Sequence, residues 1–285
     1  MKLTALHTGS FKLDGGAMFG VVPRRMWAAM HPPDEQNLCT WAMRALLIET
    51  GDRKILVDTG IGNQQDARFR AHFLPHGPES LFGALADAKV ERTDITDVLL
   101  THLHCDHCGG ALCKNETTGA VELSFPKAIY WTNQRHFDWA MHPNPREKAS
   151  FLPENFVPLH QQGRLQFIPV RQNIVFAPGV QVRFYYGHTE AMMVPVLHTE
   201  QGTVIYCADV LPSQWHIGLP YVMAYDIRPL QTLREKARLL TTAAKKRYIL
   251  FLEHDPVAEC ATVRQDAQGR IVLDQAGALA DLLHP

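Results

Sequence analysis

The stretch THLHCDHCGG, from Thr101 to Gly110, determines how the rest of the chain is interpreted. Four side chains able to ligate a metal fall within six residues of it: His102, His104, Asp106 and His107. Histidine is the commonest metal ligand in proteins, and a carboxylate beside it adds negative charge. A purely structural role rarely requires so many ligands in so short a segment, so we predict that this stretch binds metal.

The residues on either side of the ligands favour the same interpretation. An apolar strand is expected at 97–101, and it runs directly into the histidines. Because side chains alternate along a strand, His102 and His104 are expected to point to the same side. The pair Gly109-Gly110 lets the backbone bend tightly and approach the site closely.

Three later residues extend the set, each just past an apolar strand: His188, Asp209 and His254. The strands that precede them are expected at 180–186, 204–208 and 249–252. Taken singly, such a residue is usually a polar side chain with an ordinary hydrogen-bond partner. Strand ends that meet along one edge would bring these residues together with the first four.

The whole set holds more ligands than one ion needs, since a catalytic zinc takes three protein ligands and a water. Two divalent ions are therefore expected, with zinc as the first choice and manganese or iron as alternatives. We assign one ion to His102, His104 and His188, the second to Asp106, His107 and His254, and a bridging role to Asp209. A water or hydroxide between the ions would be the nucleophile.

The remaining pattern predicts alternating strands and helices. A weak strand at 3–13 and a loop at 15–27 precede the run MRALLIETGDRKILVDTG (43–60), which is a hairpin with its turn at Gly51-Asp52. A helix is expected at 81–88, a strand at 192–199, and a helix from Pro229. The apolar face of that last helix is predicted to hold Leu230, Leu233, Ala237 and Leu240.

This order is rich in β-hairpins and favours two β-sheets between outer helices over a doubly wound parallel sheet. No linker divides the chain, so we predict a single domain covering 1–285. Within it, 1–43 forms an N-terminal arm and loop. The segment 131–160, rich in aromatic residues, histidine and proline, is interpreted as an inserted cap.

Composition limits the class of protein. The 285 residues are 46% hydrophobic, and Lys plus Arg (28) nearly balances Asp plus Glu (29). No strong field is available to attract nucleic acid or an anionic membrane, so a small or neutral substrate is expected. The chain shows no apolar signal peptide or membrane-spanning stretch, which predicts a cytoplasmic protein.

The cysteines agree with a reducing compartment. All six are predicted to be free thiols, because they lack the density of a disulfide framework. Cys105 and Cys108 form a C-x-x-C motif within the metal stretch. No second such pair completes a tetrahedral site, so we interpret both as small buried thiols.

Other residues are expected to support the site. Asp58 ends the second hairpin strand, and its carboxylate is predicted to accept a hydrogen bond from a metal-bound histidine, with an ordinary turn as the alternative. Aromatic residues and histidines that could wall a substrate pocket are Phe19, Trp27, Trp131, Phe137, Trp139, His142, His216, Tyr221 and Tyr225. Core packing is the alternative for each of them.

Several motifs together resemble the metallo-β-lactamase superfamily. They are THLHCDHCGG, GHTEA at 187–191, Cys-Ala-Asp ending at Asp209, Glu-His-Asp-Pro around His254, and LVDTG at 56–60. Within it, the chain is most similar to the branch of acyl-homoserine lactonases and methyl parathion hydrolase. The resemblance implies an αββα four-layer sandwich, a dinuclear centre, and hydrolysis of an ester, lactone or phosphotriester. It also implies a homodimer, and gives Asp106 the roles of ligand and catalytic proton shuttle.

One position departs from the lactonase pattern. Those enzymes resemble one another in a tyrosine three residues after the bridging aspartate, whereas this chain has Pro212 there. A lactone oxyanion would need another donor, for which Tyr221, Tyr225 and His216 are the candidates.

Two other functions remain as alternatives. A mononuclear iron oxygenase acting on persulfides also resembles HxHxDH proteins and would leave His107 and His254 without a metal. A nuclease of the same superfamily is the other alternative, but the near-neutral charge disfavours it because binding to phosphate backbones relies on clustered Lys and Arg. One iron per chain would indicate the oxygenase.

Overall fold

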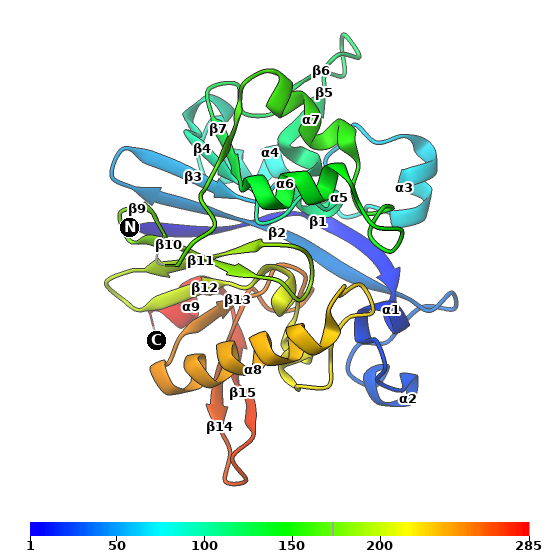
Figure 1. Cartoon of the computed structure of the whole chain (residues 1–285), viewed down its shortest axis with the longest axis vertical. Helices are drawn as coiled ribbons and strands as arrows, with labels where there is room; N and C mark the ends of the chain where they lie inside the picture. Colours follow the sequence, from blue (N-terminus) through cyan, green and yellow to red (C-terminus); the bar gives the residue numbers. More distant parts are fainter. Residues whose placement is uncertain (173, 285) are drawn as a thin grey trace. The chain divides into compact units, whose positions relative to one another are not determined.

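The computed structural model describes residues 1–172 and 174–284, and the chain forms two compact units (Figure 1). Each unit is assembled from two stretches of sequence. Unit 1 comprises Met1–Phe11 and Met43–Gln172, and unit 2 comprises Lys12–Ala42 and Asn173–Pro285. The prediction of a single domain stays a prediction.

Unit 1 is built on a mixed six-stranded sheet in the order β1-β2-β3-β4-β7-β8. The strands are β1 (Lys2–Asp14), β2 (Leu38–Thr50), β3 (Arg53–Val57), β4 (Asp97–Leu99), β7 (Ile129–Thr132) and β8 (Leu165–Phe167). The predicted hairpin is confirmed, since β2 and β3 pair antiparallel around a turn in which Gly51 has a φ of 59°. From β3 onward the neighbours are parallel, so β3 and β4 end at the same edge.

Helices flank this sheet, and all of them except α3 bury part of their surface. They are α3 (Ala67–Phe73), α4 (Leu81–Asp87), α5 (Cys105–Cys108), α6 (Gln134–Met141) and α7 (Pro153–Gln161). Two short 3-10 turns, η1 (Arg92–Asp94) and η2 (Gly109–Ala111), and a small hairpin of β5 (Leu112–Lys114) and β6 (Val121–Leu123) complete the unit. Leu85 of α4, Val98 of β4 and Phe156 of α7 belong to one buried apolar cluster.

Unit 2 holds a mixed seven-stranded sheet in the order β15-β14-β13-β12-β11-β10-β9. Its strands are β9 (Ile174–Ala177), β10 (Val180–Tyr185), β11 (Met192–His198), β12 (Thr203–Tyr206), β13 (Ile249–Phe251), β14 (Cys260–Gln265) and β15 (Ile271–Gly277). All pairs are antiparallel except β12 with β13, which are parallel and therefore end together. The strands predicted before His188, Asp209 and His254 are confirmed as β10, β12 and β13.

The helices of unit 2 are α1 (Gly15–Phe19), α2 (Arg24–Trp27), α8 (Pro229–Lys246) and α9 (Leu279–Leu283), with 3-10 turns η3 (Ala208–Val210) and η4 (Gln214–Ile217). The predicted loop at 15–27 thus contains two short helices. The long α8 packs along the sheet beside β14 (Figure 1). The expected start of α8 at Pro229 is confirmed.

The predicted apolar face of α8 is only partly right. Leu240 is buried and Leu233 and Ala237 are half-buried, but Leu230 is 69% exposed, whereas Glu235 and Lys236 are buried. The reason is that backbone groups satisfy these two side chains. The Glu235 carboxylate accepts hydrogen bonds from the N–H groups of Tyr186 and Gly187, and Lys236 Nζ donates to three backbone carbonyls. A buried charge that is fully hydrogen-bonded can replace an apolar residue on a helix face.

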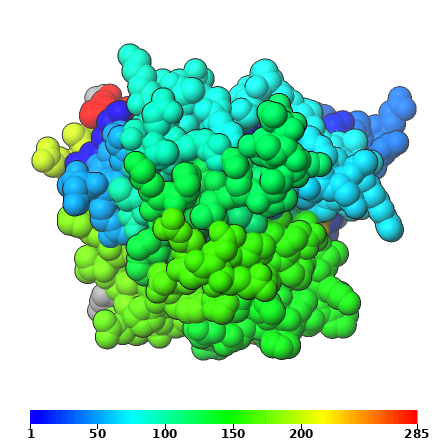
Figure 2. All heavy atoms as spheres, turned by 90° about the horizontal axis from the view of Figure 1, so that it is seen from above, coloured from blue at the N-terminus to red at the C-terminus, as the bar shows by residue number. Residues whose placement is uncertain are grey.

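The segment predicted as a cap, 131–160, holds two short helices. It contains both α6 and α7, and it is visible in green on the face of the molecule seen in Figure 2. Phe137 and Trp139 of α6 face the apolar cluster of unit 1, with Phe137 only 7% exposed.

Candidate metal centre

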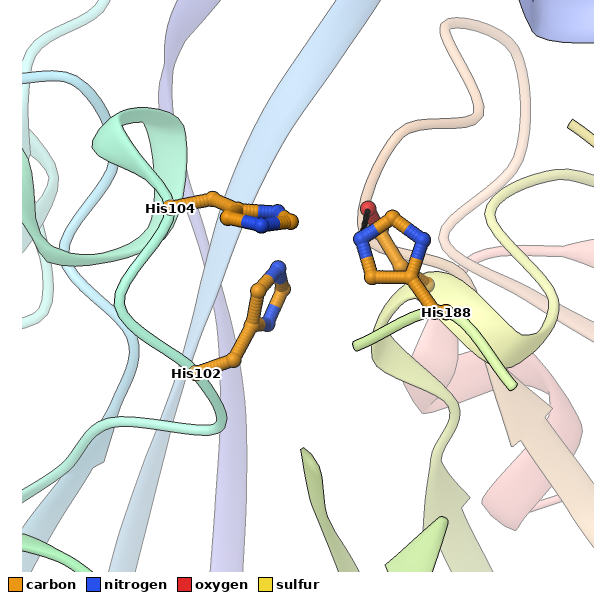
Figure 3. A group of neighbouring side chains, drawn as sticks. His102, His104 and His188 are labelled. Carbon is orange, nitrogen blue, oxygen red and sulfur yellow. Dashed lines mark ion pairs between the residues drawn. The ribbon is translucent and has the colours of Figure 1, made fainter. Parts of the chain in front are cut away.

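The four candidate ligands of unit 1 follow β4 in the chain. His104 caps the start of α5, and Asp106 and His107 lie in its only turn. The ring centroids of His102 and His104 are 4.5 Å apart, and those of His102 and His107 are 3.9 Å apart. Figure 3 shows the His102 ring with its edge directed at the His104 ring. The three histidines are buried, while the Asp106 side chain is 15% exposed.

An oxygen atom lies near one nitrogen of each of these rings. His107 Nδ1 lies 3.1 Å from Asp58 Oδ2, and His102 Nδ1 lies 3.0 Å from the Thr101 hydroxyl. His104 Nε2 lies 3.5 Å from Glu147 Oε1. Such contacts fix ring orientation and keep the second nitrogen available as a ligand atom. The second nitrogen is Nε2 in His102 and His107 and Nδ1 in His104.

Asp58 has a central position in this arrangement. Its carboxylate accepts the Thr101 N–H at 2.7 Å and the Thr101 hydroxyl at 2.6 Å, and also contacts His107. Because the same Thr101 hydroxyl contacts His102 Nδ1, Asp58 also helps to orient the His102 ring. The residue is fully buried with a φ of 56°, a conformation that the tight VDTG turn imposes. The contact expected between Asp58 and a histidine of the metal stretch is present.

The glycine pair allows a close backbone approach, as predicted. A Cβ atom on Gly109 would lie 2.2 Å from the Ile61 carbonyl oxygen, and one on Gly110 would lie 2.2 Å from the Thr59 carbonyl oxygen. Thr59 in turn donates its N–H and its hydroxyl to the His107 carbonyl, at 2.8 and 2.9 Å. The pair therefore lets the turn that follows β3 pack against the ligand stretch.

Replacing Gly110 with alanine will destabilise the protein, because the new methyl group meets backbone that cannot rotate away. We expect the free energy of unfolding to fall by about 1–3 kcal/mol, as in other overpacked interiors. Chemical denaturation monitored by circular dichroism measures it. Gly277→Ala is the matched control, since a Cβ there has nothing within 4 Å. Equal stability of the two variants would contradict the close approach.

In unit 2, Asp209 lies between two histidines. Its Oδ2 is 3.0 Å from His188 Nε2, and its Oδ1 is 3.1 Å from His254 Nε2. The dashed line in Figure 3 marks the ion pair of His188. All three side chains are buried. Each carboxylate oxygen of Asp209 therefore faces a different imidazole.

The outer nitrogens of these histidines are also held. His188 Nδ1 lies 2.8 Å from Asp226 Oδ1, and His254 Nδ1 lies 2.9 Å from the Ala42 carbonyl oxygen. Burial lowers the pKa of His188, but the carboxylates of Asp209 and Asp226 outweigh it and raise the pKa to about 10. A buried imidazole between two carboxylates thus attracts positive charge. The donor set of this unit fits a divalent cation in place of that proton.

Two acidic residues of this arrangement were not predicted, Glu147 and Asp226. Both are at most 2% exposed, and each contacts the ring of a candidate ligand. Neither follows a strand or belongs to a motif, so the sequence gives no local signal for them. Each also lies far along the chain from the histidine it contacts. Glu147 is 43 residues from His104, and Asp226 is 38 residues from His188, so the sequence does not indicate that these pairs are in contact.

Replacing Asp226 with asparagine will weaken metal binding. An amide cannot supply the negative charge that orients His188 and raises its basicity, and loss of such an outer contact typically costs about 10–100-fold in metal affinity. Competition with a chromogenic chelator measures the dissociation constant. Asp274→Asn is the control, because Asp274 pairs with Arg264 on an exposed part of β14 and β15. Unchanged affinity in Asp226→Asn would contradict the orienting role.

The residues expected to wall a pocket occupy several environments. Phe19 stacks between Trp27 and His216, with ring centroids 5.2 and 5.0 Å apart, and Tyr221 meets Phe19 edge-on at 6.2 Å. Phe19, Trp27 and His216 are at most 1% exposed. Both ring nitrogens of His216 have partners, the Ser213 hydroxyl and the Met18 carbonyl, which makes it a poor oxyanion donor. Tyr221 and Tyr225 are half-buried.

The other pocket candidates belong to unit 1. Trp131 Nε1 donates to Asp97 at 2.8 Å, and Trp139 Nε1 donates to Glu147 at 2.8 Å. Trp139 therefore helps position the carboxylate that contacts His104. His142 is exposed at the end of α6, and Phe137 lies in the apolar cluster. A role in substrate binding stays a prediction for each of these residues.

The cysteines are buried, as predicted, and all six are free thiols. Burial raises the pKa of Cys105 and of Cys108, so the C-x-x-C pair within the metal stretch disfavours the thiolate form.

The chain has two mixed sheets with flanking helices. Clusters of histidine and aspartate follow the ends of their strands. These features place it in the class of metal-dependent hydrolases. The chain belongs to the metallo-beta-lactamase superfamily, whose family model matches residues 44–254. That range contains all seven candidate ligands. The predicted superfamily and fold class are confirmed.

Known proteins agree with this assignment. An N-acyl homoserine lactonase of Bacillus thuringiensis is 25% identical over 241 residues, which cover 80% of this chain and 86% of the lactonase. A probable metal-dependent hydrolase from Staphylococcus aureus has a similar structure, with a TM-score of 0.84 and 25% identity, covering 96% of this chain and 97% of that one. AidC, a dizinc quorum-quenching lactonase, has a TM-score of 0.74 and 19% identity, covering 96% and 94%.

Within residues 1–172 and 174–284, none of the helices has the length and apolar character needed to cross a bilayer.

Proposed function

We propose that this protein is a metal-dependent hydrolase with a dinuclear centre that cleaves an ester, lactone or phosphotriester bond of a small, neutral molecule. The observation that carries the proposal is Asp209, whose two carboxylate oxygens face two different histidines. A structural ion pair needs one such contact, whereas a bridge between two cations needs both.

The ligand assignment made from the sequence is kept as part of the proposal. One ion would be held by His102, His104 and His188, and the second by Asp106, His107 and His254, with Asp209 shared. Two supports favour it. Four of the five imidazoles have one nitrogen within hydrogen-bond distance of an oxygen, the fifth lies 3.5 Å from Glu147, and the family model covers both groups of ligands. The lactonase AidC is a dizinc protein, so zinc is proposed here.

Bound divalent ions would supply a Lewis acid for the substrate oxygen and lower the pKa of a bound water. The protein's own groups have separate tasks. Asp58, Glu147 and Asp226 hold the rings in place and so avoid reorganisation during the reaction. Asp106 is partly exposed, so its carboxylate can pass a proton to the leaving oxygen and exchange it with solvent.

The class of substrate follows from charge and from Pro212. The net charge of −1 provides no strong attraction for a highly charged substrate. The Pro212 carbonyl accepts the His254 N–H at 3.1 Å, so this residue helps place His254, but its side chain offers no hydrogen-bond donor. We therefore expect aryl esters, which have good leaving groups, to be hydrolysed faster than unactivated lactones.

A hydrolysis screen tests the proposal. Zinc-loaded protein is assayed against acyl-homoserine lactones, aryl esters and phosphotriesters, with product release followed by pH-stat or absorbance. We expect turnover of at least one class, and loss of that turnover in Asp209→Asn. A protein that binds two metal ions and hydrolyses no member of the three classes would contradict the proposed function.

A further inference from the structure

Unit 1 contains a cavity of about 350 Å³ that includes none of the candidate metal ligands. Apolar side chains of Met43, Leu81 and Leu112 form part of its wall, and Cys113 and Ser124 lie in the same lining. Its volume is within the range of cavities that hold small molecules. The cavity therefore offers a second place for a ligand, separate from the proposed metal centre.

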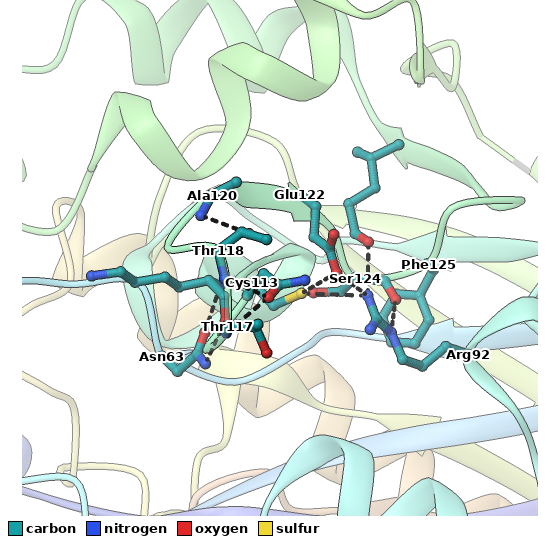
Figure 4. Close-up of polar contacts among 12 residues, drawn as sticks. Asn63, Arg92, Cys113, Thr117, Thr118, Ala120, Glu122, Ser124 and Phe125 are labelled. Atoms are coloured by element: carbon teal, nitrogen blue, oxygen red, sulfur yellow. Dashed lines mark hydrogen bonds and ion pairs between the residues drawn. The ribbon is translucent and has the colours of Figure 1, made fainter.

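Cys113 differs from the other five cysteines in its surroundings. At 6% it is the most exposed of the six, and it lines the cavity. Arg92 Nη2 donates to its Sγ at 3.4 Å, and Sγ in turn lies 3.9 Å from Glu122 Oε1, which can accept the thiol proton. Figure 4 shows Cys113 and Ser124 near one another, with Arg92 beside both.

The guanidinium beside Cys113 is held firmly. Arg92 Nε donates to the Ser124 carbonyl at 2.7 Å, its Nη2 donates to the Leu123 carbonyl at 3.0 Å, and the group lies 4.5 Å from the centroid of the Phe82 ring. A fixed donor of this kind is what a thiolate nucleophile requires in its neighbourhood.

Ser124 provides an independent indication of a ligand. It is fully buried, it lines the cavity, and its hydroxyl has no hydrogen-bond partner among residues 1–172 and 174–284. Buried hydroxyl groups without a partner are rare because they lose their water and gain nothing in return. A carboxylate or carbonyl oxygen of a molecule in the cavity would accept its hydrogen bond.

The charges of the lining indicate what kind of molecule fits. Arg70 is exposed and cationic, while Glu79 and Glu116 are exposed and anionic, and all three belong to the lining. Together with the Ser124 hydroxyl, they match a molecule that carries both an ammonium and a carboxylate group.

We propose that Cys113 is a modification site for small disulfides that carry an amino-acid ammonium and carboxylate. The Cys113 thiolate attacks one sulfur, a new S–S bond forms to that half of the reagent, and the original S–S bond breaks. The other half leaves as a thiolate and takes up the proton that Cys113 had passed to Glu122. The disulfide is the oxidant, so no other reactant is needed.

The test compares three disulfides of different charge on the full-length protein: zwitterionic cystine, dicationic cystamine and dianionic dithiodipropionate. Peptide mass spectrometry locates the modified cysteine and measures its rate. We expect cystine to modify Cys113 before any other cysteine. The rate should be at least about tenfold higher than with cystamine or dithiodipropionate, because each of those lacks one of the two charged groups that form charge-assisted hydrogen bonds with the lining.

Variants separate recognition from simple access to the thiol. Ser124→Ala is expected to slow modification by cystine but not by uncharged methyl methanethiosulfonate, and Cys113→Ser is expected to abolish the modified peptide. The wild-type measurement stands even where a variant fails to fold. Equal rates for the three disulfides, or modification of another cysteine before Cys113, would overturn the proposal.

Discussion

Replacing Asp209 with asparagine is expected to cause the largest loss of hydrolysis of any single conservative change. The carboxylate has one oxygen 3.0 Å from His188 and the other 3.1 Å from His254. An amide offers only one oxygen and no charge, so it cannot bridge two cations. We expect kcat/KM to fall by more than the ~100-fold typical of residues that only orient ligands. Steady-state kinetics on whichever substrate the screen identifies gives the value.

The control for this variant is Asp281→Asn, an exposed carboxylate on α9. Circular dichroism should show both variants folded, and the metal content of Asp209→Asn should fall below that of the wild type. Full activity and full metal content in Asp209→Asn would remove the basis of the bridging assignment.

Removal of the metal ions is expected to have the second largest effect. Hydrolysis should disappear after dialysis against a chelator, because the buried histidines and carboxylates alone supply no strong nucleophile. Stability should fall too, since a ligand that binds only the folded state contributes about 2.7 kcal/mol when its free concentration is 100 times its Kd. Differential scanning calorimetry before and after dialysis measures the change in Tm.

Re-addition of zinc should restore both activity and Tm, and chelator already saturated with zinc should have no effect. A protein that keeps its turnover after complete removal of metal would require a different catalytic group. In that case the side chains around Asp209 would be a structural ion-pair network only.

The sequence predicted the turn at Thr101–Gly110 and the strands around it because those features are local. Two ligands separated by one residue share a side, a glycine pair permits close packing, and Gly51 suits a hairpin turn with positive φ. Each of these relations involves residues within a few positions of one another. The position of His188, Asp209 and His254 just past apolar strands then led us to group them with that stretch.

What the sequence could not supply depends on distant partners. Glu147 and Asp226 contact their histidines only after the chain has folded, and nothing in their neighbouring residues marks them. The face of α8 was predicted only in part for the same reason, because Glu235 and Lys236 have backbone partners outside the helix. The spacing of apolar residues carries no information about such backbone partners. It therefore placed Leu230 on the apolar face, although that side chain is 69% exposed.

The number of metal ions per chain tests the central claim most directly. Protein purified without added metal, and the same protein equilibrated with zinc and freed of excess by gel filtration, is analysed by inductively coupled plasma mass spectrometry. The account predicts two divalent ions per chain in the equilibrated sample, falling in Asp209→Asn. A single iron per chain that zinc cannot supplement, or a protein that takes up no metal at all, would contradict it.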